Sequence, residues 1–378
     1  MRKSRMARHP WTIGRIWERR LPPGMGCGSD LLRVSTAGRV RAGNVASGRA
    51  FCNGSAERRS ERGGRCMRDG RVRALRGIVV PLVTPLRPDE SLDEQGLERV
   101  IRHVLEGGVH GVFMNSTTGE GLCLSEEQRR RALEVALQSV DGRVPVLANV
   151  AGTSLRNALR ELRQAVEIGA DAVVAHPPFF YPINDQREIL DFYRRLAEES
   201  PLPVFIYNLP MVVGTGISPS VLSELLEYER IVGIKDSSAD FVYLTRLIEL
   251  KRRRPDFRIF IGKSHLWAAG IWSGADGGLD GVSNVAPRLC VELFEALERG
   301  ELERAVELQR RVNEVWKLYE CRSFLAAVKM AVSKLGLCGP TVSSPILGLS
   351  PEEEGYVESV LRRSGLLELQ ANEREERR

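Results

Sequence analysis

Two stretches of the sequence indicate the fold: Val204-Phe205-Ile206-Tyr207-Asn208-Leu209-Pro210 and Ile231-Val232-Gly233-Ile234-Lys235-Asp236. Each is a short apolar run that ends in polar side chains, and Tyr207 precedes Lys235 by 28 residues. That spacing holds one strand, one helix and their connections, which is the repeat of a βα unit. The pattern predicts adjacent strands that deliver Tyr207 and Lys235 to the same cavity.

The same alternation continues on both sides of this pair. Short strand-like runs are separated by longer amphipathic segments, and no Gly-x-Gly-x-x-Gly follows the first of them. We therefore predict an α/β fold, a (β/α)₈ TIM barrel over residues 67–300. The eight predicted strands are Gly77–Val83, Gly111–Asn115, Val144–Val150, Ala172–His176, Val204–Tyr207, Val232–Lys235, Arg258–Gly262 and Gly277–Val282.

Helix signals support the prediction. Ser125 and Gln128 have the spacing of a capping box, in which each side chain satisfies a free backbone amide at a helix start. After residue 300 the strand pattern stops, and three helical stretches predict a C-terminal helical extension over 301–378. They are Glu301–Tyr319, Ser323–Leu335 and Pro351–Arg363, and the charged tail from Glu368 is expected to fray.

Charge is divided unevenly along the 378 residues. The chain carries +6 overall, but residues 1–76 hold 18 Arg and one Lys against five acids, a balance of +14, so the remainder carries −8. Residues 1–66 lack helical or strand periodicity, and we expect a disordered basic leader. A wrongly assigned start codon, with Met67 as the true start, is favoured over a targeting peptide or an arm for nucleic acid.

Composition narrows the functional class. The chain is 43% hydrophobic and 28% charged, as in ordinary soluble proteins, and no apolar run is long enough for a membrane span. Seven scattered cysteines without a Cys-x-x-Cys pair predict reduced thiols and a cytoplasmic protein. The five histidines show no metal-ligand spacing, so no metal is expected.

Barrel enzymes build their sites at the carboxyl ends of the strands, which limits the candidates. Lys235 ends a buried strand, where loss of hydration favours the neutral amine that attacks carbonyls. A salt bridge to Asp236 is the competing interpretation, and a packing role is the alternative for Tyr207. The loop Asn115-Ser116-Thr117-Thr118-Gly119-Glu120-Gly121 offers amides and hydroxyls for a carboxylate, or is an ordinary polar turn.

These motifs resemble the dihydrodipicolinate synthase and N-acetylneuraminate lyase superfamily of Schiff-base barrels, from about Gly77 to Leu366. The resemblance rests on Val83-Thr84-Pro85, Ser116-Thr117-Thr118-Gly119-Glu120, Tyr207-Asn208-Leu209-Pro210 and Gly233-Ile234-Lys235-Asp236. It implies that Lys235 forms the Schiff base, that Tyr207 moves the proton, and that no dissociable cofactor is required. It also implies that Thr117 and Thr118 bind the carboxylate of a 2-oxo acid, and that Leu279 lines the pyruvate pocket.

Two positions depart from the family. True dihydrodipicolinate synthases place an arginine two residues after Tyr-Asn-x-Pro to bind the carboxylate of the aldehyde, and here that residue is Val212. The family's Pro-Pro-Tyr-Tyr becomes Pro-Pro-Phe-Phe, so Phe180 replaces a relay tyrosine whose work falls to Tyr181 or a water. Lys263, after the seventh strand, is a candidate for the second substrate, with a solvated surface lysine as the alternative.

The sequence thus predicts a class I aldolase, a carbon-carbon lyase that joins pyruvate or another 2-oxo acid with an aldehyde. A 2-oxo-3-deoxy sugar acid or a 4-hydroxy-2-oxo acid is the expected substrate. The alternatives are 4-hydroxy-tetrahydrodipicolinate synthase, a dehydratase of the same family, and a non-catalytic 2-oxo-acid binder. Nucleic-acid binding is disfavoured because an acidic body repels phosphates. The resemblance further implies a homo-oligomer, a homotetramer or a dimer.

Overall fold

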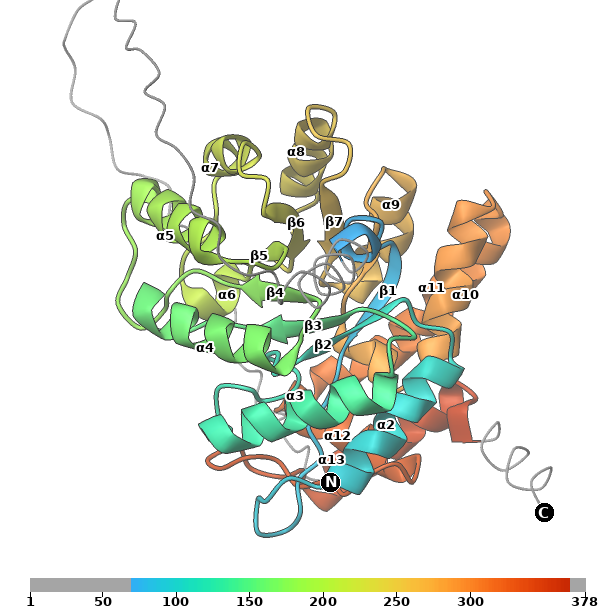
Figure 1. Cartoon of the computed structure of the whole chain (residues 1–378). Helices are drawn as coiled ribbons and strands as arrows, with labels where there is room; N and C mark the ends of the chain where they lie inside the picture. The colour runs from blue at the N-terminus through green and yellow to red at the C-terminus, as the bar shows by residue number, and fades with distance from the viewer. Residues whose placement is uncertain (1–68, 368–378) are drawn as a thin grey trace, which may run out of the picture. The chain divides into compact units, whose positions relative to one another are not determined.

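Eight parallel strands form a closed barrel in chain order, with helices around it (Figure 1). The structure is a computed structural model, and it describes residues 69–367. The strands are β1 Gly77–Pro81, β2 Gly111–Met114, β3 Val146–Asn149, β4 Ala172–Ala175, β5 Val204–Asn208, β6 Ile231–Asp236, β7 Arg258–Ile261 and β8 Gly277–Gly278. This is the predicted (β/α)₈ TIM barrel with its C-terminal helices.

The helices follow the strands as the periodicity predicts. They are α2 Glu94–Glu106, α3 Glu126–Val140, α4 Leu155–Ile168, α5 Gln186–Glu199, α6 Pro210–Val213, α7 Pro219–Leu225, α8 Phe241–Lys251, α9 Trp267–Trp272, α10 Pro287–Glu298, α11 Leu302–Trp316, α12 Phe324–Lys334 and α13 Pro351–Arg363. The predicted capping box of α3 is present, since Ser125 Oγ accepts from the Gln128 amide and Gln128 Oε1 accepts from the Ser125 amide. This bond pair fixes the start of α3.

Alternating side chains along the strands build two separate apolar layers. Val79, Phe113, Leu147 and Phe205 point inward and fill the barrel. Their neighbours in sequence, such as Val80, pack against the helices. Side chains of a strand alternate between its two faces, so a strand buried on both faces is apolar throughout. This explains the continuous apolar runs of the sequence.

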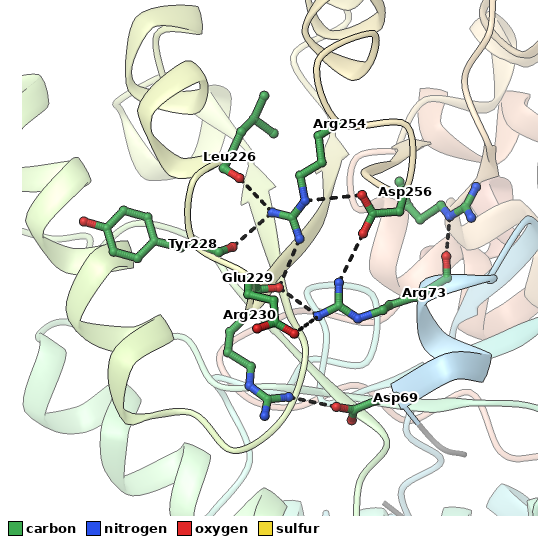
Figure 2. Close-up of polar contacts among 9 residues, drawn as sticks. Asp69, Arg73, Leu226, Tyr228, Glu229, Arg230, Arg254 and Asp256 are labelled. Atoms are coloured by element: carbon green, nitrogen blue, oxygen red, sulfur yellow. Dashed lines mark hydrogen bonds and ion pairs between the residues drawn. The ribbon is translucent and has the colours of Figure 1, made fainter. Parts of the chain in front are cut away.

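The residues before β1 close the amino-terminal end of the barrel. Val72 and Leu75 belong to the inner apolar cluster, and Arg73 donates to Asp256 at 3.2 Å and to the Glu229 carbonyl at 2.9 Å (Figure 2). Arg254 donates to the carbonyls of residues 226 and 228, both at 3.0 Å (Figure 2). Arg73 thus fastens the segment at 69–76 to the loops before β6 and β7, and Arg254 ties these two loops to each other, opposite the predicted site.

The predicted eighth strand, Gly277–Val282, is wrong beyond Gly278. The structure has only Gly277–Gly278 as β8, followed by a 3₁₀ helix over Gly281–Asn284. The side chain of Asn284 accepts from the Val83 amide at 3.0 Å and donates to the Pro81 carbonyl at 2.9 Å. A side chain therefore satisfies the end of β1, where a longer eighth strand would have supplied backbone partners.

The extension agrees with the prediction in number and place, with one correction. The helix predicted over Glu301–Tyr319 ends at Trp316, and Lys317–Glu320 continues as a 3₁₀ turn. The tighter turn changes the direction in which Tyr319 leaves the helix, because 3₁₀ and α turns differ in residues per turn.

Several predictions concern residues outside 69–367, the range that the structure describes. The leader at 1–66, the three cysteines within it and the tail from Glu368 lie outside the described residues. The four described cysteines, Cys123, Cys290, Cys321 and Cys338, are free thiols. Within 69–367, no helix has the length and apolarity to cross a bilayer. The division at residues 67–300 and 301–378, and the homo-oligomer, stay predictions.

Candidate active site

Lys235 and Tyr207 lie next to each other at the carboxyl end of the barrel. Strands β5 and β6 pair in parallel with Tyr207 opposite Lys235. The Lys235 Nζ lies 4.1 Å from the centre of the Tyr207 ring and 5.4 Å from that of Phe113, and the residue is only 4% exposed. The amine thus sits inside the barrel against two aromatic rings, away from bulk water.

A bulge in β6 turns the lysine inward. The register advances by one residue on β5, from Val204 to Phe205, but by two on β6, from Ile231 to Gly233. Ile231 and Ile234 therefore both face the helices, although they lie three positions apart, where strict alternation would put them on opposite faces. One extra residue reverses the phase of a strand, so without it Lys235 would face outward.

Gly233→Ala is expected to lower the free energy of unfolding by about 1–3 kcal/mol, as overpacking of a core does. A Cβ on Gly233 would lie 2.5 Å from Cε1 of Phe205 and 2.6 Å from the carbonyl oxygen of Arg258, so the bulge must shift. Chemical denaturation measures the loss. Gly355→Ala, where an added Cβ meets nothing within 4 Å, is the control. Equal stability of the two variants would contradict the role given to the bulge.

Asp236 is not a partner of Lys235. Its carboxylate accepts from Asn208 Nδ2 at 2.8 Å and from Ser238 Oγ at 2.9 Å. Burial raises the pKa of Asp236, although these two hydrogen bonds act in the opposite direction. The described contacts of Lys235 contain no ion pair, so the salt-bridge interpretation from the sequence is wrong in this structure. Lys235 is a buried amine next to a phenol and without a counter-ion among residues 69–367.

The loop after β2 is held from three sides. Thr84 Oγ1 donates to the Gly119 carbonyl at 2.7 Å, and Ser116 Oγ accepts from the Gly119 amide at 3.2 Å. Glu120 forms a buried ion pair with Lys329 of α12 and accepts from the Ser343 amide at 2.6 Å. Thr118 is buried and Thr117 half-buried in this fixed loop.

The structure places Leu279 and Lys263 differently from each other. Leu279 is buried in the inner cluster that contains Tyr207. Lys263, after β7, is partly exposed, and its side chain makes no hydrogen bond or ion pair among the described contacts. Leu279 thus lies inside the barrel, while Lys263 lies at the rim with its ammonium group uncommitted among the described contacts.

Neither of the residues at the two departures contributes a polar group to the cavity. Phe180 and Tyr181 are 80% and 75% exposed, and the centres of their rings lie 5.1 Å apart. Val212 is also largely exposed. Tyr181 is therefore not placed beside Tyr207 to take over the role of a relay tyrosine.

The structure adds a histidine to the candidate site. His176 directly follows β4 and is buried. The centre of its ring lies 6.3 Å from the centre of the Tyr207 ring. Burial lowers the pKa of His176, and nearby Lys235 acts in the same direction. Its Nδ1 lies 2.8 Å from the Pro177 carbonyl, an acceptor, so the neutral ring carries its proton there and leaves Nε2 as a proton acceptor. The sequence analysis did not single out His176, although its place at a strand end was a signal that could have found it.

Asp280 and Tyr319 form the second polar group that sequence reasoning missed. The Tyr319 hydroxyl donates to Asp280 Oδ1, and the Ser264 amide donates to Asp280 Oδ2 at 2.7 Å. Burial and the neighbouring carboxylate raise the pKa of Tyr319 well above its ordinary value. Asp280 follows β8, whereas Tyr319 comes from the extension. A sequence pattern gives no signal for such a pair.

Metal ligands are not grouped in the part of the chain that the structure describes. Within residues 69–367 no cluster of three or more His, Cys, Asp or Glu side chains is arranged to hold an ion. The chemistry available from the described side chains is that of an amine, a phenol, hydroxyls and an imidazole. Such groups serve nucleophilic attack and proton transfer.

Comparison with known proteins identifies the class. A model of the Dihydrodipicolinate synthetase family matches residues 74–364. An uncharacterized DapA-like lyase of Halobacterium salinarum is 36% identical over 293 residues, which cover 78% of this chain and 95% of that protein. A 4-hydroxy-tetrahydrodipicolinate synthase of Methanothrix thermoacetophila is 32% identical over 287 residues, covering 76% and 96%.

Solved structures agree with this family match. YagE, a prophage protein of the dihydrodipicolinic acid synthase family from E. coli K12, was solved in complex with pyruvate. It aligns with a TM-score of 0.74 and 26% identity over 77% of this chain and 99% of its own. Fold and relatives together define a lyase on a (β/α)₈ barrel. The chain belongs to the dihydrodipicolinate synthetase family.

Proposed function

We propose that this lyase is a pyruvate-dependent class I aldolase in which Lys235 forms the Schiff base. The observation that carries the proposal is the Lys235 Nζ, which is buried 4.1 Å from the centre of the Tyr207 ring and has no counter-ion among residues 69–367. A neutral amine in such a place attacks the ketone of a 2-oxo acid and releases water. The complex of YagE with pyruvate supports the choice of oxo acid.

In the proposed mechanism the iminium at Lys235 withdraws electrons from the adjacent carbon, so that a carbon-carbon bond next to it breaks or forms. Tyr207 moves the proton between substrate oxygens, and the amides and hydroxyls of Thr117 and Thr118 bind the carboxylate. Leu279 packs against the methyl side of the oxo acid. His176, with Nε2 free to accept a proton, is a further base beside the amine.

We propose a hydroxylated second substrate, a 2-oxo-3-deoxy sugar acid or a 4-hydroxy-2-oxo acid. Val212 gives no cation where an arginine would bind a semialdehyde carboxylate, and a charge-assisted hydrogen bond of about 1.5–3 kcal/mol is lost. Lys263, with its uncommitted ammonium group at the rim, is assigned to the distal end of this substrate. Synthesis of 4-hydroxy-tetrahydrodipicolinate is the second candidate, because relatives such as the Methanothrix protein carry that name.

Purified enzyme with pyruvate is expected to condense D-glyceraldehyde with a kcat/KM at least about tenfold above that for aspartate semialdehyde, since the missing hydrogen bond disfavours the latter. Pyruvate consumption measures both reactions. Val212→Arg is the matched variant and should raise activity with aspartate semialdehyde alone. A wild-type preference for aspartate semialdehyde would replace the proposal with the second candidate. If the enzyme neither bound nor consumed pyruvate, both candidate functions would be excluded.

A further inference from the structure

The C-terminal extension reaches the candidate oxo-acid pocket through Tyr319. A Cβ on Gly281 would lie 2.6 Å from the Tyr319 hydroxyl oxygen and 3.5 Å from Thr118 Oγ1. The phenol and the threonine therefore lie against the same glycine, on the rim formed after β8 and β2. Tyr207 is also close enough to act electrostatically on Tyr319. The extension thus contributes a polar group next to the loop assigned to the substrate carboxylate.

The position of Tyr319 is fixed by aromatic stacking. Its ring stacks on Trp316 at 5.7 Å between centres and on Phe324 at 5.0 Å, with interplanar angles of 7° and 10°. His265 meets the Trp316 ring edge-on at 4.9 Å. The two stacked rings and the bond to Asp280 hold the phenol in one orientation. Its hydroxyl is therefore committed to one carboxylate.

Asp280 is a charge that the pocket must tolerate. It is only 4% exposed, stands one residue before Gly281, and its carboxylate accepts from the Tyr319 hydroxyl and from the Ser264 amide. Lys263 and His265 follow β7 nearby, and Asp280 and Lys263 both act electrostatically on His265, but the described contacts include no ion pair to Asp280. Two neutral donors therefore compensate this carboxylate.

An uncompensated carboxylate here would repel the carboxylate of a 2-oxo acid bound at Thr118. The repulsion grows as the effective dielectric constant falls on burial. A hydrogen bond to an ionised group disperses its charge and is stronger than a neutral one. Removing the Tyr319 hydroxyl would leave the Asp280 charge free to act on the pocket.

We propose that Tyr319 is a positioning residue of the oxo-acid site: by donating to Asp280 it keeps that buried charge compensated, so that the pocket accepts an anionic substrate. The inference rests on the proposed function, since it presumes a 2-oxo acid at Lys235. It assigns the extension a role in substrate affinity rather than in stability alone.

The test measures the half-saturating concentration of pyruvate for borohydride trapping on Lys235, followed by intact mass. Tyr319→Phe keeps the stacked ring and is expected to raise this concentration about tenfold. The neutral ester methyl pyruvate is the matched probe, and its half-saturation should change by less than about twofold because it carries no carboxylate charge. In the double variant Asp280→Asn/Tyr319→Phe, the half-saturating concentration of pyruvate is expected to return to within about threefold of the wild-type value.

Tyr356→Phe is the control variant. Tyr356 also belongs to the extension and donates to a carboxylate, Glu320 Oε2 at 2.6 Å, but that pair is exposed. The Tyr356→Phe variant should trap pyruvate as the wild type does. Equal weakening of pyruvate and methyl pyruvate in Tyr319→Phe, no weakening at all, or no rescue by Asp280→Asn would each overturn the inference. A wild-type enzyme that traps no pyruvate would instead remove the proposed function on which it rests.

Discussion

Lys235→Arg is expected to lower aldol cleavage or condensation by at least about 10³-fold and to abolish reductive trapping of pyruvate. Arginine keeps the positive charge and much of the length, but its guanidinium group stays protonated and cannot form an imine. The inner cluster around Phe113 and Tyr207 should keep its packing, so the loss would be chemical. Initial rates with pyruvate and an aldehyde measure the first effect, and mass spectrometry the second.

Lys251→Arg is the matched control for this experiment. The Lys251 Nζ donates to Asp276 Oδ2 at 2.7 Å, at the amino-terminal end of the barrel, where an arginine can keep the ion pair. The variant should retain both activity and trapping. If Lys235→Arg still trapped pyruvate, the reacting amine would belong to another lysine.

Lys329→Met is expected to lower the free energy of unfolding by about 3–5 kcal/mol, because it leaves a buried carboxylate unpaired. The side chain of Lys329 is fully buried and that of Glu120 is 1% exposed, and the two form an ion pair between α12 and the loop after β2. The Ser343 amide, at 2.6 Å, is the remaining partner of Glu120 and cannot neutralise it. Denaturant unfolding followed by circular dichroism gives the measurement.

Two further variants separate charge from packing. Lys334→Met changes a lysine of the same helix that pairs with Glu358 at 3.7 Å on the surface, and it should cost less than about 1 kcal/mol. Adding Glu120→Gln to Lys329→Met removes the unpaired charge and should recover part of the loss. If Lys329→Met alone were as stable as Lys334→Met, the buried pair would not secure the Thr117-Thr118 loop.

Sequence periodicity was sufficient for the barrel and for placing Tyr207 and Lys235 at the ends of adjacent strands. Strand ends are local properties, so the spacing of the two residues predicted neighbouring positions, but not the bulge that turns Lys235 inward. The shortened β8 could not be predicted, because the side chain of Asn284 completes β1 through bonds to residues about 200 positions away. Local pattern carries no information about such a partner.

The remaining site residues depend on tertiary contacts in the same way. The Asp280–Tyr319 bond joins residues 39 positions apart, and the bond from Ser343 to Glu120 spans 223. The inward direction of Lys235 requires a bulge that strict alternation does not predict. His176 lay within a predicted strand, but the comparison with Pro-Pro-Tyr-Tyr directed attention to Phe180, which proves exposed.

We expect one buried amine to capture the oxo acid. Incubation of the wild-type protein with pyruvate, reduction with borohydride and mass mapping of the modified peptide should reveal one adduct per chain, on Lys235. The Lys235→Arg variant should carry no adduct. An adduct on a different lysine, or an unmodified protein at saturating pyruvate, would contradict this expectation.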